Sequence, residues 1–353
     1  MKKIIYSILL ASFPLLIFSC KKTEEEKPVY QQKTKADDAS ARSEMQRAYD
    51  DIETVYNSTE YENASTSSLR TSGTVLPCGK VTFDKKNFTI DYSQSGSNCN
   101  PYRVISGSID VTLISGTTFS DQNAKLKVVF TNYKVLYTNS NQSVIYNGTA
   151  YITNASGGSL ITLFTNTPNA EVIHKVRGDM TLTFDTTGTN TAVAFTRSWK
   201  IFRKRTFQNT PGTETGITFK LEGDTSFASA DYFNNGSGGN FTNVSEIGLN
   251  TENEKFICDV TTPFKWYDCG PDYYGPYVLK QGKVEYTSYT AKPVYVALGY
   301  TKFYWSGEAG YRYDNAVYTY DGSCNSAGYK IDFSLRKASD NSAIYSASSY
   351  IPY

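Results

Sequence analysis

The chain has 353 residues, with 35 Lys and Arg against 34 Asp and Glu and a formal net charge of +1. This near-neutral balance gives no global field for a polyanion, so the composition argues against a nucleic-acid-binding protein. The length is sufficient for one large domain or two modest domains with hydrophobic cores of their own.

The N-terminus has the features of a secretory signal peptide over residues 1–19. Two lysines precede an apolar run over residues 4–18, which is shorter than the ~20 residues that a membrane-spanning helix needs. Cys20 follows directly, at the point where the apolar run gives way to charged residues. Residues 20–36 are polar and show no apolar period, so we predict a flexible tether there.

The sequence Ile17-Phe18-Ser19-Cys20 resembles a bacterial lipobox, although Phe18 replaces the usual small residue. The resemblance implies cleavage before Cys20, lipid attachment to its sulfur and a membrane partner through this anchor. The alternative is a simple secreted protein in which Cys20 has no role. The following "KKTEEE" resembles the surface-export signal of Bacteroidota lipoproteins. We therefore expect a lipid-anchored outer-membrane protein that is exposed at the cell surface, with the periplasmic face as the alternative.

Residues from Asp37 to about Asn57 show the period of one amphipathic helix. Met45, Tyr49 and Ile52 recur at spacings of three and four residues. A Ser/Thr-rich linker follows up to residue 74. A lone helix is only marginally stable in water, so its apolar stripe has to dock on the remaining chain, dock on a second copy, or fray. We predict that residues 37–74 form a spacer outside the β core.

From residue 75 onward, apolar and polar residues alternate with a period of two, as in strands with one buried face. Turn sequences such as "DTTGTN" and "YDGSCNSAG" separate these segments, and no helical pattern comes between them. The pattern predicts an all-β body that is mainly antiparallel, either a sandwich or a large curved sheet.

Two segments that begin with Cys-Gly and lead to Gly-Ser-(x)-Cys-Asn suggest two related β halves, over residues 75–207 and 208–353. An exported chain meets oxidising conditions, so its cysteines can pair. The repeated frames favour bridges between Cys78 and Cys99 and between Cys269 and Cys324, with Cys258 left over. The rival pairing is a hairpin bridge between Cys258 and Cys269.

The order of lipobox, N-terminal helix and cysteine-containing β body resembles an uncharacterised β-rich family of Bacteroidota lipoproteins. The resemblance supports the expected fold and location. It contributes no catalytic residue and no cofactor, because the family has no assigned activity.

The chain has a single histidine, which restricts the chemistry that it can support. His174 has the strand parity of Val172 and Val176, so we predict that it lies in the core. No G-x-S-x-G sequence marks an activated serine, and the histidine count excludes a histidine-rich zinc site. The segment from Asp231 has the composition of a calcium loop, but Phe233 stands where an oxygen ligand is needed, so a hairpin turn is the favoured interpretation. We predict no metal and no cofactor.

Aromatic residues crowd the C-terminal third of the chain. They either pack within the sheet or display a ligand surface that suits a glycan or a surface protein; the candidate residues are Tyr304, Trp305, Tyr311 and Tyr313. Glu308 and Asp314 lie in the same region and allow the alternative of a glycosidase-like envelope hydrolase with paired carboxylates. We favour a binding or structural module, and whether the protein is an enzyme stays open.

The segment "RSWKIFRKR" over residues 197–205 combines basic and aromatic residues, as nucleic-acid-binding strands do. Its charges divide between the two strand parities, however, whereas a binding groove needs most of them on one side. We therefore predict a solvated strand whose charges resist edge pairing.

Overall fold

The fold is taken from a computed structural model. It describes residues 29–66, 71–73, 76, 78–93, 103–139, 141–165, 170–185, 195–209, 217–233, 239–250, 253–268, 277–289, 302–314, 317–320, 328–337 and 339–352.

The helices are α1 (Val29–Tyr56), α2 (Thr59–Thr66), α3 (Leu160–Thr165) and α4 (Ser229–Phe233). The strands are β1 (Thr71–Gly73), β2 (Lys80–Asp84), β3 (Asn87–Asp91), β4 (Arg103–Ser115), β5 (Ala124–Tyr137), β6 (Gln142–Asn154), β7 (Glu171–Asp185), β8 (Phe195–Asn209), β9 (Ile217–Gly223), β10 (Thr225–Ala228), β11 (Asn240–Leu249), β12 (Lys255–Asp268), β13 (Tyr277–Tyr289), β14 (Lys302–Asp314), β15 (Val317–Tyr320), β16 (Gly328–Arg336) and β17 (Ala343–Pro352).

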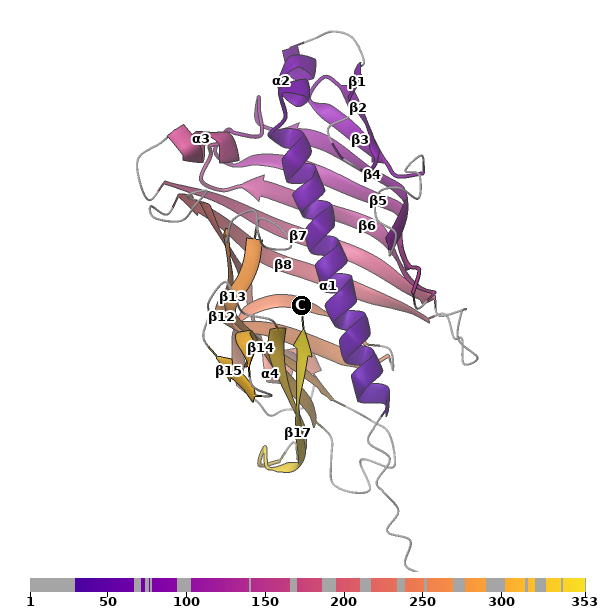
Figure 1. The fold of residues 1–353 in the computed structure, drawn as a ribbon, viewed down its shortest axis with the longest axis vertical. Coiled ribbons are helices and arrows are strands. Elements are labelled where there is room, and N and C mark those ends of the chain that lie inside the picture. Colours follow the sequence, from indigo (N-terminus) through magenta and orange to yellow (C-terminus); the bar gives the residue numbers. More distant parts are fainter. Residues whose placement is uncertain are drawn as a thin grey trace, which may run out of the picture.

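The strands of the described residues join into one 17-stranded sheet whose pairs are antiparallel. Strands β1 to β9 pair in chain order, and so do β10 to β14. The pairs β8–β11 and β9–β12 join these two runs, and β14 then pairs with β15 and β16. The predicted all-β, mainly antiparallel fold is confirmed, and the architecture is the large curved sheet. Figure 1 shows α1 lying across one face of this sheet.

The long strands form because their side chains alternate between an apolar interior and a more polar exterior. In β5, Leu126, Val128 and Phe130 are buried, whereas the intervening Lys127 is exposed. The side-chain period of a strand is two, so this alternation places one face of β5 on the core and leaves the other accessible to solvent.

A bulge between β4 and β5 depends on a glycine. The register shifts between Ser106 and Ser108, and Gly107 between them has a φ of 88°. A Cβ atom at Gly107 would collide with the backbone carbonyl of Asn132. This close approach and the positive φ both require glycine, which lets the long β4–β5 ribbon bend.

Helix α1 is part of the core. The stripe that includes Met45, Tyr49 and Ile52 is buried in one hydrophobic cluster with residues of β2 to β8 and β12. Of the predicted alternatives, the stripe therefore docks on the β body. The prediction that residues 37–74 form a spacer outside the β core is wrong, because the apolar stripe of α1 and residues of α2 belong to the same hydrophobic cluster as the strands.

The bounds of the N-terminal elements also differ from the prediction. Helix α1 begins at Val29, earlier than the predicted start at Asp37, and ends at Tyr56. Part of the predicted Ser/Thr-rich linker is regular structure, since α2 and β1 lie within it. In α2, Tyr61 and Ala64 are buried, and the Tyr61 ring centroid lies 4.6 Å from that of Tyr56. Because the segment is rich in Ser and Thr, its sequence did not indicate these apolar contacts.

The boundary predicted between residues 207 and 208 falls inside β8. The two runs of strands share one sheet through the pairs β8–β11 and β9–β12, so they are not separated by a break in hydrogen bonding. The internal relationship between the two halves stays a prediction.

Several predicted residues lie outside the described part of the chain, namely Cys20, Cys99, Cys269 and Cys324. Cys78 lies just before β2 and is not a free thiol. Cys258, on β12, is a fully buried thiol that forms no disulfide and accepts a hydrogen bond from Arg42. This agrees with the pairing that leaves Cys258 over and not with the rival bridge to Cys269.

Candidate functional site

The contact between α1 and the sheet contains buried charges as well as apolar side chains. Glu44 and Glu53 of α1 are both buried, and the sheet contributes the buried residues His174, Arg203 and Arg205. Buried charges are costly unless a partner of opposite charge and further hydrogen bonds compensate for the lost hydration. Each of these carboxylates therefore needs a partner, and the partners fall into three groups along the helix.

The first group is centred on Glu246 of β11, which is 2% exposed. Its Oε2 atom lies 2.7 Å from Arg42 Nε of α1, and its Oε1 atom lies 2.7 Å from Arg203 Nη2 of β8. Trp199 Nε1 donates a third hydrogen bond, at 3.1 Å. Burial alone would raise the pKa of Glu246, but the two guanidinium groups outweigh it and lower the pKa to about 2.

The second group holds the middle of α1 on β4 to β6. Arg103 Nε of β4 forms an ion pair with Glu44 Oε2 at 2.8 Å, and the Tyr137 hydroxyl donates to Glu44 Oε1 at 3.0 Å. The Tyr146 hydroxyl donates to the backbone carbonyl of Ala41 at 2.9 Å. These contacts come from the inward faces of adjacent strands, so they fix the position of the helix along the sheet.

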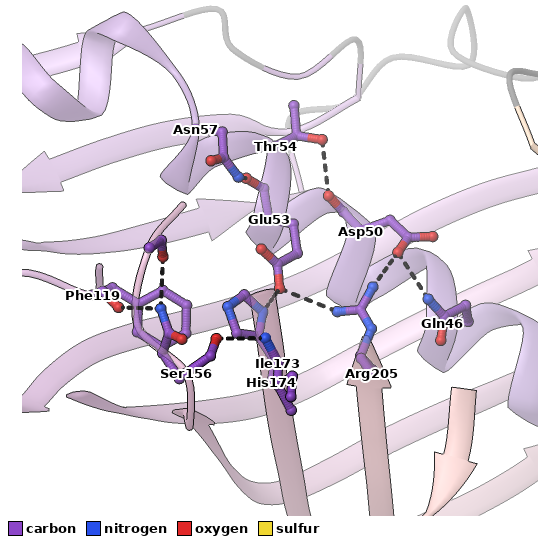
Figure 2. A network of polar contacts seen from close by, with 12 residues as sticks. Gln46, Asp50, Glu53, Thr54, Asn57, Phe119, Ser156, Ile173, His174 and Arg205 are labelled. Carbon is purple, nitrogen blue, oxygen red and sulfur yellow. Dashed lines mark hydrogen bonds and ion pairs between the residues drawn. The ribbon is translucent and has the colours of Figure 1, made fainter. Parts of the chain in front are cut away.

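The third group lies toward the C-terminal end of α1 (Figure 2). His174 Nδ1 of β7 lies 2.6 Å from Glu53 Oε1, and Arg205 Nη1 of β8 lies 3.4 Å from the same oxygen. Arg205 Nη2 also lies 2.6 Å from Asp50 Oδ1, whose side chain is 54% exposed. Gln46 Nε2 donates to that Asp50 oxygen at 2.9 Å. The group thus runs from solvent at Asp50 to a buried imidazole.

The protonation of this group follows from its partners. Burial would raise the pKa of Glu53, but His174 and Arg205 outweigh that effect and hold the pKa below its ordinary value. An ionised carboxylate only accepts hydrogen bonds, so the proton between Glu53 and His174 belongs to Nδ1. The other ring nitrogen, Nε2, accepts a hydrogen bond in a neutral imidazole and donates one in an imidazolium. It is buried and has no hydrogen-bond partner in the described residues.

The His174 ring lies between two aromatic rings, with centroid distances of 4.9 Å to Phe119 and 5.6 Å to Phe207. In Figure 2, its unpaired nitrogen lies on the side of Phe119, away from Glu53. The predicted core position of His174 is therefore confirmed, but only one of its two nitrogens is satisfied. A buried polar atom without a partner is uncommon and needs an explanation.

A cavity of about 50 Å³ lies beside this imidazole, between the C-terminal end of α1, the turn after β4 and the segment between β6 and α3. His174 and Glu53 are buried at its inner end, and Thr118 and Ser120 are exposed at its outer end. Its other lining residues mix hydroxyl, amide and apolar groups and include Tyr56, Asn57, Tyr61 and Leu160. The site therefore combines two buried polar atoms without a hydrogen-bond partner in the described residues, His174 Nε2 and the Tyr56 hydroxyl, with further hydroxyl groups and an apolar wall.

The imidazole of His174 has no hydroxyl beside it in the described residues. A Ser-His-acid mechanism needs a hydroxyl within hydrogen-bond reach of the histidine, and no described hydroxyl occupies that position at Nε2. Among the described residues, no group of three or more His, Cys, Asp or Glu side chains is placed to hold a metal ion.

The predicted aromatic surface maps to β14. Tyr304 is partly buried, and its ring centroid lies 4.2 Å from the Arg336 guanidinium carbon. Burial raises the pKa of Tyr304 to about 12. The side chains of Trp305, Tyr311 and Tyr313 lie outside the described part of the structure. A ligand surface at these residues stays a prediction.

The carboxylates of the hydrolase alternative also lie on β14. Glu308 pairs in register with Lys283 of β13 and Lys330 of β16, and Asp314 pairs with Val317 of β15. The side chain of Asp314 is outside the described part, so the paired-carboxylate alternative stays a prediction. The loop that begins at Asp231 is only partly described, since residues 234–238 are outside it.

The prediction that residues 197–205 form a solvated strand is wrong. Strand β8 is central, because it pairs with β7, β9 and β11. Its arginines at odd positions, Arg197, Arg203 and Arg205, are buried on the same face as Trp199, whereas Lys200 faces outward and pairs with Asp179. The shared parity of these arginines with Trp199 was the signal in the sequence that could have indicated inward-facing charge.

Sequence reasoning missed Glu53, Arg205 and Glu246 as members of the site. An acidic side of α1 next to its apolar stripe is visible in the sequence, but acidic residues on a helix are usually solvated. No described helix combines the length and the apolar character that crossing a membrane requires. Comparison of the chain with family models, with curated proteins and with solved structures gave no match.

Proposed function

We propose that the protein is a lipid-anchored module of the cell envelope that binds a glycan or another surface protein. Cys20, in its lipobox-like sequence, is the proposed point of lipid attachment, and the outer membrane is the proposed location, with the body exposed at the cell surface. The aromatic residues of β14 and the cavity beside His174 are the two candidate sites for a ligand.

The observation that carries this proposal is the position of the cavity relative to the anchor. The chain from Cys20 joins α1 at Val29, and a 28-residue helix is about 40 Å long. The cavity lies at the opposite end of α1, next to Glu53 and Tyr56. In Figure 1 that end of α1 adjoins α2 and is remote from the end at which the chain enters the helix. A protein anchored through Cys20 would therefore present this cavity away from the membrane.

The buried ion pairs support the same proposal. The three groups fix α1 on the sheet at its middle, through Arg42 and Glu44, and near its C-terminal end, through Glu53. The helix that forms one wall of the cavity is therefore tied to the strand that carries His174. A binding site that is rigid before the ligand arrives loses less conformational entropy on binding. This is what a recognition module needs.

A glycan array tests the proposal with the full-length protein in detergent. We expect retention of a defined set of glycans without release of reducing sugar. The alternative of a hydrolase would be supported by sugar release that Glu308→Gln abolishes. Absence of glycan binding, together with absence of any cross-linked surface protein on intact cells, would contradict the proposal.

We also propose disulfides between Cys78 and Cys99 and between Cys269 and Cys324. The first would close a loop that contains β2 and β3, and a bridge over about twenty residues stabilises a fold by ~3 kcal/mol in the chain-entropy model. Peptide mapping without reduction is expected to recover both pairs and a free Cys258. Any disulfide to Cys258 would contradict the second bridge.

A further inference from the structure

We propose that the cavity beside His174 is the ligand site, and that it takes the hydroxyl-bearing edge of a neutral sugar with one hydroxyl hydrogen-bonded to His174 Nε2. This inference rests on the proposed function as a glycan-binding module and assigns that function to a particular site. It starts from His174 Nε2, which with the Tyr56 hydroxyl is one of two buried polar atoms of the described lining that have no hydrogen-bond partner.

The first step is the hydrogen-bonding character of that atom. Glu53 Oε1 fixes the ring at 2.6 Å through Nδ1, so Nε2 is held at a fixed position in the cavity lining. A buried polar atom without a partner costs free energy, and a hydrogen-bonding group that enters the cavity recovers it. A hydroxyl group is the best complement, because it can donate to Nε2 of a neutral imidazole and accept from Nε2 of an imidazolium.

The second step is size. A water needs about 10–15 Å³ of such space, so a cavity of about 50 Å³ holds about four water-sized groups. A whole sugar ring does not fit within that volume, but a hydroxymethyl group or two adjacent hydroxyls do. The ring itself would remain at the outer end, between the exposed residues Thr118 and Ser120.

The third step is the lining. Sugars present apolar C–H faces together with hydroxyl edges, and their sites commonly combine an aromatic ring with hydrogen-bonding side chains. Here Phe119 and Tyr56 provide aromatic surface, while Asn57 and Tyr61 provide polar groups beside it. No acidic side chain other than Glu53 lines the cavity, so a cationic ligand is not favoured.

The single histidine makes the proposal directly testable. In protein with ¹³C,¹⁵N-labelled histidine, the one imidazole gives one set of NMR signals, and a hydrogen bond formed at Nε2 shifts its nitrogen and Cε1 resonances. We expect saturable shifts with at least one of the methyl glycosides of glucose, galactose, mannose and N-acetylglucosamine. Ser120→Tyr, at an exposed position at the outer end, is expected to abolish the shift. Gln122→Tyr, at an exposed position of the same turn that does not line the cavity, is the matched control and should retain it.

The outcomes separate this site from the wider proposal. Glycan binding on the array that persists in Ser120→Tyr, without any shift at His174, would overturn the cavity as the site and leave a glycan-binding function at another surface such as β14. A shift that Ser120→Tyr does not reduce would also overturn the site. Failure of both the array and the NMR titration would overturn the site and the function together.

Discussion

Glu246 lies where α1, β8 and β12 meet, and each of its two carboxylate oxygens contacts a different arginine. We predict that Glu246→Gln strongly destabilises the fold, because it leaves Arg203 buried without its negative partner. Loss of one member of a buried pair costs about 3–5 kcal/mol. Chemical denaturation at pH 7 measures this change. Glu222→Gln is the matched control, because its pairs with Lys204 and Lys220 lie at the surface and are worth about 0–1 kcal/mol.

The same residue predicts a pH dependence. The pKa of Glu246 is lowered from 4.5 to about 2, so its stabilising contribution is fully present above about pH 4.5 and is lost as the pH falls toward 2. We expect the free energy of unfolding of the wild type to fall over this window more steeply than that of Glu246→Gln, by about 3 kcal/mol. Parallel curves for the two proteins would show that Glu246 is not held ionised by its arginines.

At the scale of single residues, the sequence predicted which side chains are buried better than it predicted which side chains they contact. The parity of His174 was enough to place it in the core. Its partner Glu53 lies 121 residues away in the chain, and no local pattern links a helix carboxylate to one particular strand. The same holds for Arg205, whose inward orientation follows from parity with Trp199 but whose pairing with Asp50 depends on where α1 docks.

At the scale of elements, α1 and the sheet depend on each other. A chain that begins at Thr74 would expose the buried residues His174, Arg203 and Arg205 together with the apolar face that Met45 and its neighbours cover. We therefore predict that this truncated chain aggregates or lacks a cooperative thermal transition, as monitored by near-UV circular dichroism.

A chain that begins at Val29 is the control for this truncation, because it keeps α1 and removes only residues before the helix. A peptide of residues 29–66, added in excess to the shorter chain, is expected to restore part of the transition through the same contacts. A shorter chain that melts cooperatively within a few degrees of the control would contradict the role of α1 in the core.

The elements were also predictable to different degrees. Alternation of apolar and polar residues identifies strands such as β5 because one face is buried and the other is not. The start of α1 and the helix α2 were missed because their polar composition has a weak apolar period, and their helical structure depends on tertiary contacts such as that between Tyr61 and Tyr56. The single curved sheet could not be distinguished from a sandwich, because pairs such as β8–β11 join strands that are distant in sequence.

At the scale of the whole molecule, the long axis of α1 connects the chain segment that carries the proposed anchor to the candidate ligand site. The first part of this arrangement rests on sequence alone, since Cys20 lies outside the described residues. The second part rests on the structure, in which Glu53 of α1 contacts His174 at the cavity. The functional proposal therefore requires both ends, and substitution of Cys20 tests the anchor.

The variant Cys20→Ser, expressed in the native host, tests the proposed lipid anchor. The thioether that joins a lipid to the protein needs the cysteine sulfur, so we predict that the variant incorporates no clickable fatty acid during metabolic labelling. Because acyl chains contribute ~0.8 kcal/mol for each buried methylene, the protein without them should leave the membrane fraction or accumulate as the uncleaved precursor. Ser19→Ala keeps a small residue before the cysteine and should label as the wild type does. Equal labelling of Cys20→Ser and wild type would show that the lipid, if any, is attached elsewhere, and the orientation proposed for the cavity would lose its basis.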